Sequence, residues 1–320
     1  MAVEPASHEP GDVGRPGRFH SKVVRVAAVL PAYLRETARS ADCPPGLRPW
    51  VADLPRTVTE LAARWELQVG DPYQPGGRCS WVAPAVDARG RSVVLKVGWT
   101  HPEAVHEADA LRFWAGDGAV RLHAAQSFAD TSALLLERCR PGGTLGSLVG
   151  EPEQDVVIAG LLGRLWRDPP ALHPYRTLTA MCGQWADEAE LTLADGRAVP
   201  LDVGLVRAGL ELLRVLPASA GRQVLLCTDL HADNVLAAQR EPWLVIDPKP
   251  HVGDPAFDVV QHLLNCTERL QEDPPRLAGR MAHLLDLDRQ RLMSWLFARC
   301  VQESVDDPSL AGLAARLAPS

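Results

Sequence analysis

The sequence predicts an α+β fold of two lobes: a small β-rich N-terminal lobe with one long helix, and a larger, mainly helical C-terminal lobe. Short β-type runs separated by turn clusters fill residues 66–98 and return at 119–139, whereas helical periodicity prevails from Pro141 onward. One β-rich insert, at residues 224–248, interrupts the helical part. The pattern changes at residues 140–143, so we expect lobes over 21–139 and 140–320.

The N-terminal lobe is predicted as follows. Residues 1–20 are rich in Pro, Gly and charge and predict a disordered tail. Helical patterns cover 23–39 and 46–65, and β-type runs follow at 66–70, 79–86 and 92–98. Residues 101–115 predict a helix that opens on Pro102 and Glu103, both suited to a first turn. Two more strands are expected at 119–126 and 132–139.

The C-terminal lobe is predicted to hold helices over 152–167, 176–193 and 201–216, and again from Pro255 to the end of the chain. Trp166, Trp185 and Trp295 are most simply explained as core residues of these helices.

Composition excludes several classes of protein. With 320 residues, 46% of them hydrophobic, the chain can bury a sizeable core, and its formal charge of -7 argues against nucleic acid as the main partner. The chain contains no uninterrupted stretch of 18 apolar residues, so no membrane span is expected, and the N-terminus has no apolar signal region. The seven cysteines are widely scattered, which favours reduced thiols in a cytoplasmic protein. The oligomeric state is not predicted.

The strongest chemical signal is formed by Asp229, Asn234 five residues beyond it, and Asp247 thirteen residues later. Phosphoryl transfer from a nucleotide needs a carboxylate that orients the attacking hydroxyl, and an amide and a second carboxylate that hold magnesium. Alternatively, these are turn and capping residues. The combination of all three after a β-type run favours the catalytic interpretation.

The second signal is Lys96, one of only three lysines, which lies within an apolar strand eleven residues before Glu107. A buried ammonium needs a partner, and we expect Glu107 to supply it, with Glu103 as the alternative. Such a lysine could bind nucleotide phosphates; otherwise it is a solubilising residue of an edge strand.

Lys249, two residues after Asp247, is open to two interpretations, a surface charge or an ammonium near the transferred phosphoryl group. Asp254 and Asp258 precede a helix, and we favour a structural role for both over substrate contact.

The motifs VLK, HEADALR, LLLER, DLHADNVL and IDPKPHVGDPAFD occur in this order between residues 64 and 265, and they resemble those of the aminoglycoside phosphotransferase family. More narrowly, the chain is similar to the branch of streptomycin 6-phosphotransferases and hydroxyurea phosphotransferases. The resemblance implies a protein-kinase-like fold, use of ATP or GTP with Mg²⁺, and phosphorylation of a hydroxyl group.

The resemblance also implies a role for each matched residue. Lys96 would bind the nucleotide phosphates and Glu107 would hold it. Asp229 would be the catalytic base, and Asn234 and Asp247 would be magnesium ligands.

Residues of the segment that joins the lobes, Glu137 and Cys139, would lend backbone groups to the purine edge. Gly76, Gly77 and Ser80 are weak candidates for phosphate contact, because the loop lacks the glycine-rich pattern and a two-glycine turn explains them almost as well. A second departure is Cys227-Thr228, where the family usually has His-Gly before the catalytic Asp, which puts the rigidity of that loop in question.

Charge indicates the kind of substrate. From residue 229 to the end there are 14 acidic and nine basic residues, which suits a cationic small molecule such as streptomycin. The reachable acidic candidates are Glu268, Glu272, Asp273, Glu303, Asp306 and Asp307. The alternatives are a kinase of hydroxyurea or of a hydroxylated metabolite, and a catalytically silent nucleotide-binding protein.

Overall fold

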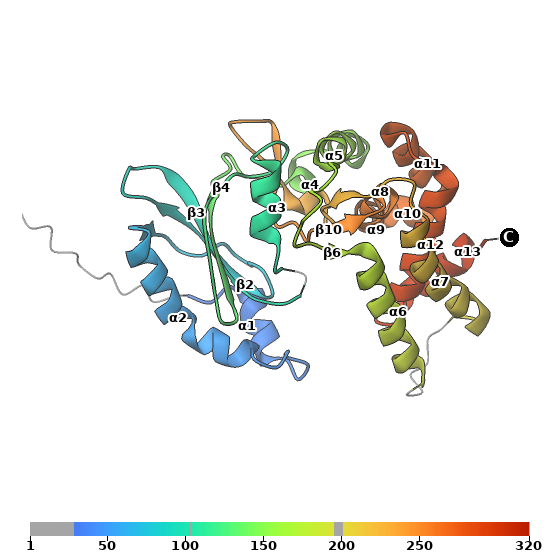
Figure 1. Ribbon diagram of the computed structural model, residues 1–320, viewed down its shortest axis with the longest axis horizontal. Coiled ribbons are helices and arrows are strands. Elements are labelled where there is room, and N and C mark those ends of the chain that lie inside the picture. Colours follow the sequence, from blue (N-terminus) through green and yellow to red (C-terminus); the bar gives the residue numbers. More distant parts are fainter. Residues whose placement is uncertain (1–28, 103, 195–200, 320) are drawn as a thin grey trace, which may run out of the picture.

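The N-terminal lobe is built on one antiparallel sheet (Figure 1). The computed structural model describes residues 29–102, 104–194 and 201–319, so the tail predicted for 1–20 and residues 23–28 of the first predicted helix lie outside it. The elements are α1 (Ala32–Arg39), α2 (Leu47–Arg64), β1 (Gln68–Val69), β2 (Ser80–Val86), β3 (Ser92–Trp99), α3 (Glu107–Trp114), β4 (Leu122–Phe128) and β5 (Thr131–Glu137). The strand order is β1-β2-β3-β5-β4.

Alternation along β2 and β3 gives the sheet two different faces. Trp81, Leu95 and Val97 are buried in a small core with Trp50 and Leu54 of α2. The intervening residues point to the opposite face, where α3 lies between the sheet and the C-terminal lobe (Figure 1). A lysine on β3 can therefore face the space between the lobes.

The helix predicted over 101–115 begins only at Glu107. Ala104 donates its N–H to the His101 carbonyl at 2.9 Å, and this turn precedes the helix, so Pro102 does not lie in the first helical turn. Starting at 107 places the acidic side chains of Glu107 and Asp109 in the first turn, where the helix dipole favours them. The long helix of this lobe is α2, which has 18 residues and precedes the strands.

The C-terminal lobe is mainly helical, as expected. Its helices are α4 (Leu145–Leu148), α5 (Glu151–Leu165), α6 (Leu178–Ala194), α7 (Val203–Val215), α8 (Pro255–Asp258), α9 (Val260–Asn265), α10 (Thr267–Glu272), α11 (Pro274–Leu285), α12 (Arg289–Glu303) and α13 (Ala311–Leu317). Its strands form a three-stranded sheet, β6 (Arg176–Thr177), β10 (His251–Gly253) and β7 (Val224–Leu226), and a hairpin of β8 (Val235–Ala237) and β9 (Trp243–Val245). The predicted β insert is thus confirmed, with β7, β8 and β9 inside it.

The larger hydrophobic core crosses the boundary between the lobes. It includes Leu111 and Trp114 of α3 and Val120 together with residues of α5 and of the β8–β9 hairpin. Trp114 also donates its indole N–H to the Leu165 carbonyl at 2.9 Å. Helix α3 therefore packs against the C-terminal lobe as well as against the sheet of its own lobe. Among the described residues, no helix is long and apolar enough to cross a membrane.

Candidate functional site

Four charged side chains meet where the lobes face each other. Lys96 donates to both carboxylate oxygens of Glu107, at 2.8 and 2.7 Å, so the predicted pairing is present. The same ammonium lies 2.7 Å from Oδ1 of Asp247, and Lys249 lies 2.7 Å from that oxygen as well. The cluster thus joins β3, α3 and the segment after β9 through two positive and two negative groups.

The electrostatics of this cluster keep Lys96 and Asp247 ionised. Burial opposes the charge on Lys96, but the carboxylates of Asp247 and Glu107 outweigh it and raise the pKa of Lys96. Burial likewise opposes the charge on Asp247, and Lys96 and Lys249 hold the pKa of Asp247 well below its usual range. At neutral pH Asp247 is therefore an ionised carboxylate, the form in which it can bind a metal ion.

Asp229 and Asn234 lie in the loop between β7 and β8. The Asn234 side-chain N–H donates to the Asp229 carbonyl at 2.9 Å, which leaves the Asn234 amide oxygen for another partner. Ile246 donates its backbone N–H to the Asn234 carbonyl at 2.9 Å, so Asn234 and Asp247 lie on adjacent segments. An amide oxygen beside a carboxylate is a donor set that fits Mg²⁺.

Asp258 accepts hydrogen bonds from the backbone of this loop. Its side chain is fully buried and accepts the backbone N–H of Cys227 at 3.0 Å, that of Thr228 at 2.5 Å and the Trp166 indole N–H at 3.0 Å. The structural role expected for Asp258 is present, but Asp258 holds the loop that carries Asp229, because it ends α8 and does not begin a helix. Asp254 does cap α8, accepting the Ala256 N–H at 3.0 Å.

Thr228 adopts a backbone conformation that glycine usually adopts, although this chain has Cys227-Thr228 before Asp229. Thr228 has a φ of 52°, in the left-handed region that costs a β-branched residue energy. Its hydroxyl donates to the Lys249 carbonyl, and its N–H is held by Asp258. These bonds compensate for the residue type, so the loop that carries Asp229 is tied to the segment that carries Asp247.

A cavity of about 230 Å³ opens beside Asp229. Thr228, Asp229 and Lys249 are among the residues that line it. The remaining lining residues come from α6, α9, β10 and α12: Met181, Trp185, His251, Gln261, Arg299 and Glu303. Lys249 thus lines the same cavity as Asp229, which favours the second interpretation given above over a surface charge.

Arg299 lines the same cavity and contacts two of the other lining residues. Its guanidinium stacks on Trp185, 4.4 Å from the ring centroid, and pairs with Glu303. The Glu303 side chain is 36% exposed, and among the described residues only one of its carboxylate oxygens has a side-chain partner. Glu303 is therefore a carboxylate held in place with an oxygen left for a ligand.

Of the six acidic substrate candidates, only Glu303 lines the cavity that contains Asp229. Asp273 caps the N-terminus of α11, and Asp307 caps the N-terminus of a short 3₁₀ helix, Pro308–Leu310. The others, Glu268, Glu272 and Asp306, are exposed elsewhere. Trp185 is partly buried: it packs against the core as predicted and also borders the cavity, and Trp166 and Trp295 are buried as expected.

The segment between the lobes offers few backbone groups that could bind a purine. The Glu137 N–H donates to the Arg121 carbonyl at 2.8 Å, and the Glu137 carboxylate is bound by Arg240. The backbone carbonyl is thus the group of Glu137 that could bind a purine. Cys139 is half-buried, and burial raises the pKa of its thiol to about 12, so the side chain is inert and only its backbone can contribute.

The phosphate-loop candidates differ in what holds them. A Cβ on Gly76 would come within 2.4 Å of Pro31, and one on Gly77 within 2.5 Å of the Ser80 hydroxyl, so close packing explains both glycines. Ser80 opens β2 on the same face as Val82, which is paired with Lys96. Its hydroxyl is therefore on the side of the sheet where phosphates would bind.

Several residues of the site were not found from the sequence. Trp185, His251, Gln261 and Arg299 converge from four elements far apart in the chain, and no local motif marks them. A second buried group, Asp155 with His262 and Cys266, has ligand atoms within 4.8 Å of one another. Two guanidinium groups already occupy the Asp155 carboxylate (Arg269 and Arg280, each at 2.7 Å), so this group is a structural network.

Comparison with known proteins gives consistent results. Residues 64–307 match the family described as aminoglycoside/hydroxyurea antibiotic resistance kinase. The chain is 38% identical over 266 residues to streptomycin 6-kinase of Streptomyces griseus, covering 81% of this chain and 85% of that protein. It is 37% identical over 302 residues to hydroxyurea phosphotransferase of Kitasatospora aureofaciens, covering 92% and 86%.

Solved structures share the fold. A choline/ethanolamine kinase family protein from Mesorhizobium loti superposes with a TM-score of 0.55 at 16% identity, covering 78% of this chain and 87% of that one. A thermostable mutant of an aminoglycoside phosphotransferase gives a TM-score of 0.51 at 18% identity, covering 80% and 96%. The predicted protein-kinase-like fold is confirmed.

Proposed function

Because the chain belongs to the aminoglycoside/hydroxyurea antibiotic resistance kinase family, we propose that it transfers the γ-phosphoryl group of ATP or GTP to the 6-hydroxyl of streptomycin. The observation that supports this proposal most is that Asp229, Lys249 and Glu303 line one cavity. A substrate that bears both a hydroxyl and a cationic group matches a cavity lined by Asp229 and by the Glu303 carboxylate.

Each residue has a chemical task in this proposal. Asp229 accepts hydrogen bonding from the attacking hydroxyl and takes its proton as the new oxygen–phosphorus bond forms. The bond from the γ-phosphorus to the bridging oxygen breaks, and the nucleoside diphosphate leaves. Lys96 and Lys249, which rest on Asp247, supply positive charge beside the phosphates.

Asp247 and the Asn234 amide oxygen would hold Mg²⁺, which would neutralise phosphate charge when bound. The Glu107 carboxylate would keep Lys96 oriented as the nucleotide arrives. On the substrate side, Glu303 would accept a guanidinium group of streptomycin.

Hydroxyurea is the second candidate acceptor, since the relative from Kitasatospora aureofaciens matches 92% of the chain. It carries a hydroxyl but no cationic group, so it would use Asp229 without Glu303. This difference separates the two acceptors experimentally.

The test is nucleotide turnover by purified protein with streptomycin, other aminoglycosides, hydroxyurea and no acceptor. We expect Mg²⁺-dependent turnover with streptomycin that disappears in Asp229→Asn, and growth protection of a streptomycin-sensitive host. Turnover with hydroxyurea alone would assign the chain to the second acceptor, and turnover with none of these compounds would contradict the proposal.

A further inference from the structure

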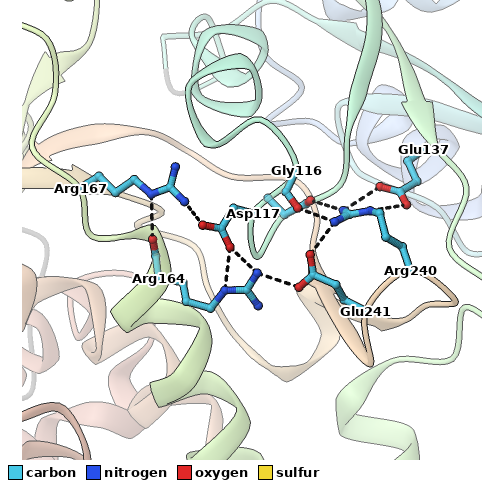
Figure 2. Close-up of polar contacts among 8 residues, drawn as sticks. Gly116, Asp117, Glu137, Arg164, Arg167, Arg240 and Glu241 are labelled. Atoms are coloured by element: carbon cyan, nitrogen blue, oxygen red, sulfur yellow. Dashed lines mark hydrogen bonds and ion pairs between the residues drawn. The ribbon is translucent and has the colours of Figure 1, made fainter.

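Arg240, in the turn of the β8–β9 hairpin, uses every N–H group of its guanidinium (Figure 2). Nε and Nη2 donate to the two carboxylate oxygens of Glu137 at 2.9 and 3.0 Å. Nη1 donates to the Gly116 carbonyl at 2.7 Å and to Glu241, and Nη2 donates to the Ala119 carbonyl at 3.0 Å. A lysine could not reproduce this geometry, since its ammonium has three donors at one point.

The hairpin that bears Arg240 also carries the expected metal ligands at its other end. Asn234 directly precedes β8, and Asp247 lies two residues after β9. Each strand has three residues, so the hairpin is only about 10 Å long. A short paired segment of this kind transmits a displacement of its turn to its base.

The acceptors of Arg240 belong to two parts of the N-terminal lobe that the nucleotide site needs. Glu137 ends β5, where the chain passes between the lobes. Gly116 and Ala119 follow α3, the helix that begins with Glu107, the partner of Lys96. The guanidinium of Arg240 therefore links three elements: β5, the end of α3, and the β8–β9 hairpin that carries the expected metal ligands.

A second set of contacts holds the same loop from the side of α5 (Figure 2). Arg164 donates to Asp117 at 2.8 Å and lies 2.7 Å from Glu241, and Arg167 also pairs with Asp117. Backbone bonds add to these, as Val120 donates to the Val245 carbonyl at 3.0 Å. The loop stays attached to the C-terminal lobe without Arg240, so a variant at this position is expected to fold.

We propose that Arg240 is a positioning residue for phosphoryl transfer: it fixes β5 and α3 relative to the β8–β9 hairpin, and so keeps Lys96 and Asp247 at one point. The proposal rests on the proposed use of a magnesium nucleotide. It assigns no contact between Arg240 and the nucleotide itself.

The experiment compares Arg240→Ala and Arg240→Lys with wild type and with Arg214→Ala. Arg214 also joins two carboxylates, Asp187 and Glu190, but at the α6–α7 contact, so it controls for the general loss of a bidentate pair. Binding of the magnesium complexes of AMP-PNP and GMP-PNP is measured by calorimetry, and turnover gives the Mg²⁺ half-saturation and both KM values. Thermal unfolding confirms that each variant is folded.

We expect Arg240→Ala to weaken binding of the magnesium nucleotide about tenfold or more, the scale seen when groups that orient metal ligands are lost. The KM for the acceptor should stay unchanged, and Arg240→Lys should lie between Arg240→Ala and wild type. Glu137→Gln should weaken binding in the wild-type background and add little in the Arg240→Ala background, because the two residues act as one unit.

Equal nucleotide binding by wild type and Arg240→Ala would overturn this proposal while leaving the proposed function intact. Equal weakening by Arg240→Ala and Arg214→Ala would also overturn it, because it would show a general loss of stability. If wild type binds neither nucleotide, the proposed function fails and this proposal fails with it.

Discussion

The clearest quantitative prediction concerns Asp258→Asn. Burial raises the pKa of Asp258 to about 6 from an ordinary 3.8, against the hydrogen bonds from Cys227, Trp166 and Thr228 that favour the charged form. Each pKa unit corresponds to about 1.4 kcal/mol, so ionising Asp258 in the folded protein costs about 3 kcal/mol. This contribution to stability is fully present below pH 3.8 and is lost as the pH rises through about 6.

The change removes that titration and keeps the shape of the side chain. The wild-type advantage in unfolding free energy over Asp258→Asn should therefore fall by about 2 kcal/mol between about pH 4.5 and 7.5, the part of the total within this range. The measurement is urea unfolding followed by tryptophan fluorescence at several pH values. Asp202→Asn, which alters an exposed helix cap, serves as the control.

The activity of Asp258→Asn should fall, even though its stability relative to wild type improves as the pH rises. An amide presents an NH₂ group to one of three N–H donors, so the backbone of Cys227 or Thr228 must shift. Displacement of the loop that carries Asp229 should lower kcat about tenfold to a hundredfold. A stability difference that stays constant with pH, or grows as pH rises, would refute the reasoning, because it would show that the hydrogen bonds outweigh burial.

Three further predictions address the rest of the site. Lys96→Met leaves two carboxylates without their shared ammonium and should cost about 3–5 kcal/mol in urea unfolding; a loss below about 1 kcal/mol would contradict the pairing seen here. Thr228→Val keeps the strained φ and removes the hydroxyl bond, so by thermal unfolding it should be less stable than Thr228→Gly by about 1–3 kcal/mol; equal stability would contradict this. Glu303→Gln should raise the KM for streptomycin about tenfold, since hydrogen bonds to charged groups contribute about 1.5–3 kcal/mol. The same variant should leave turnover of hydroxyurea unchanged if wild type shows any, and an unchanged KM for streptomycin would exclude Glu303 from substrate binding.

Local patterns were sufficient to predict the parts of the site that lie in short segments. The pairing of Lys96 with Glu107 follows from the cost of a buried ammonium, although the helix begins later than the apolar pattern suggested. The expected metal ligands Asn234 and Asp247 flank a hairpin whose strands and turn are visible in the sequence.

The rest depends on how distant segments meet. Arg299 and Trp185 come together only when α12 packs near α6, and six exposed-looking acids could not be ranked before Glu303 was seen to line the cavity. Asp258 was expected to act at a helix start, but its position at the end of α8 turns it toward the backbone of Cys227. Arg240 carries no local sign of Glu137, Gly116 and Ala119, the acceptors that lie more than 100 residues earlier in the chain.

The most direct test of the central claim is the structure of the product. Purified protein is incubated with magnesium nucleotide and streptomycin, and the position of any new phosphate ester is determined by ³¹P–¹H correlation NMR, with Asp229→Asn in parallel. We predict a single ester at the 6-hydroxyl with wild type and none with the variant. An ester formed equally well by Asp229→Asn, or no ester with wild type, would contradict the account.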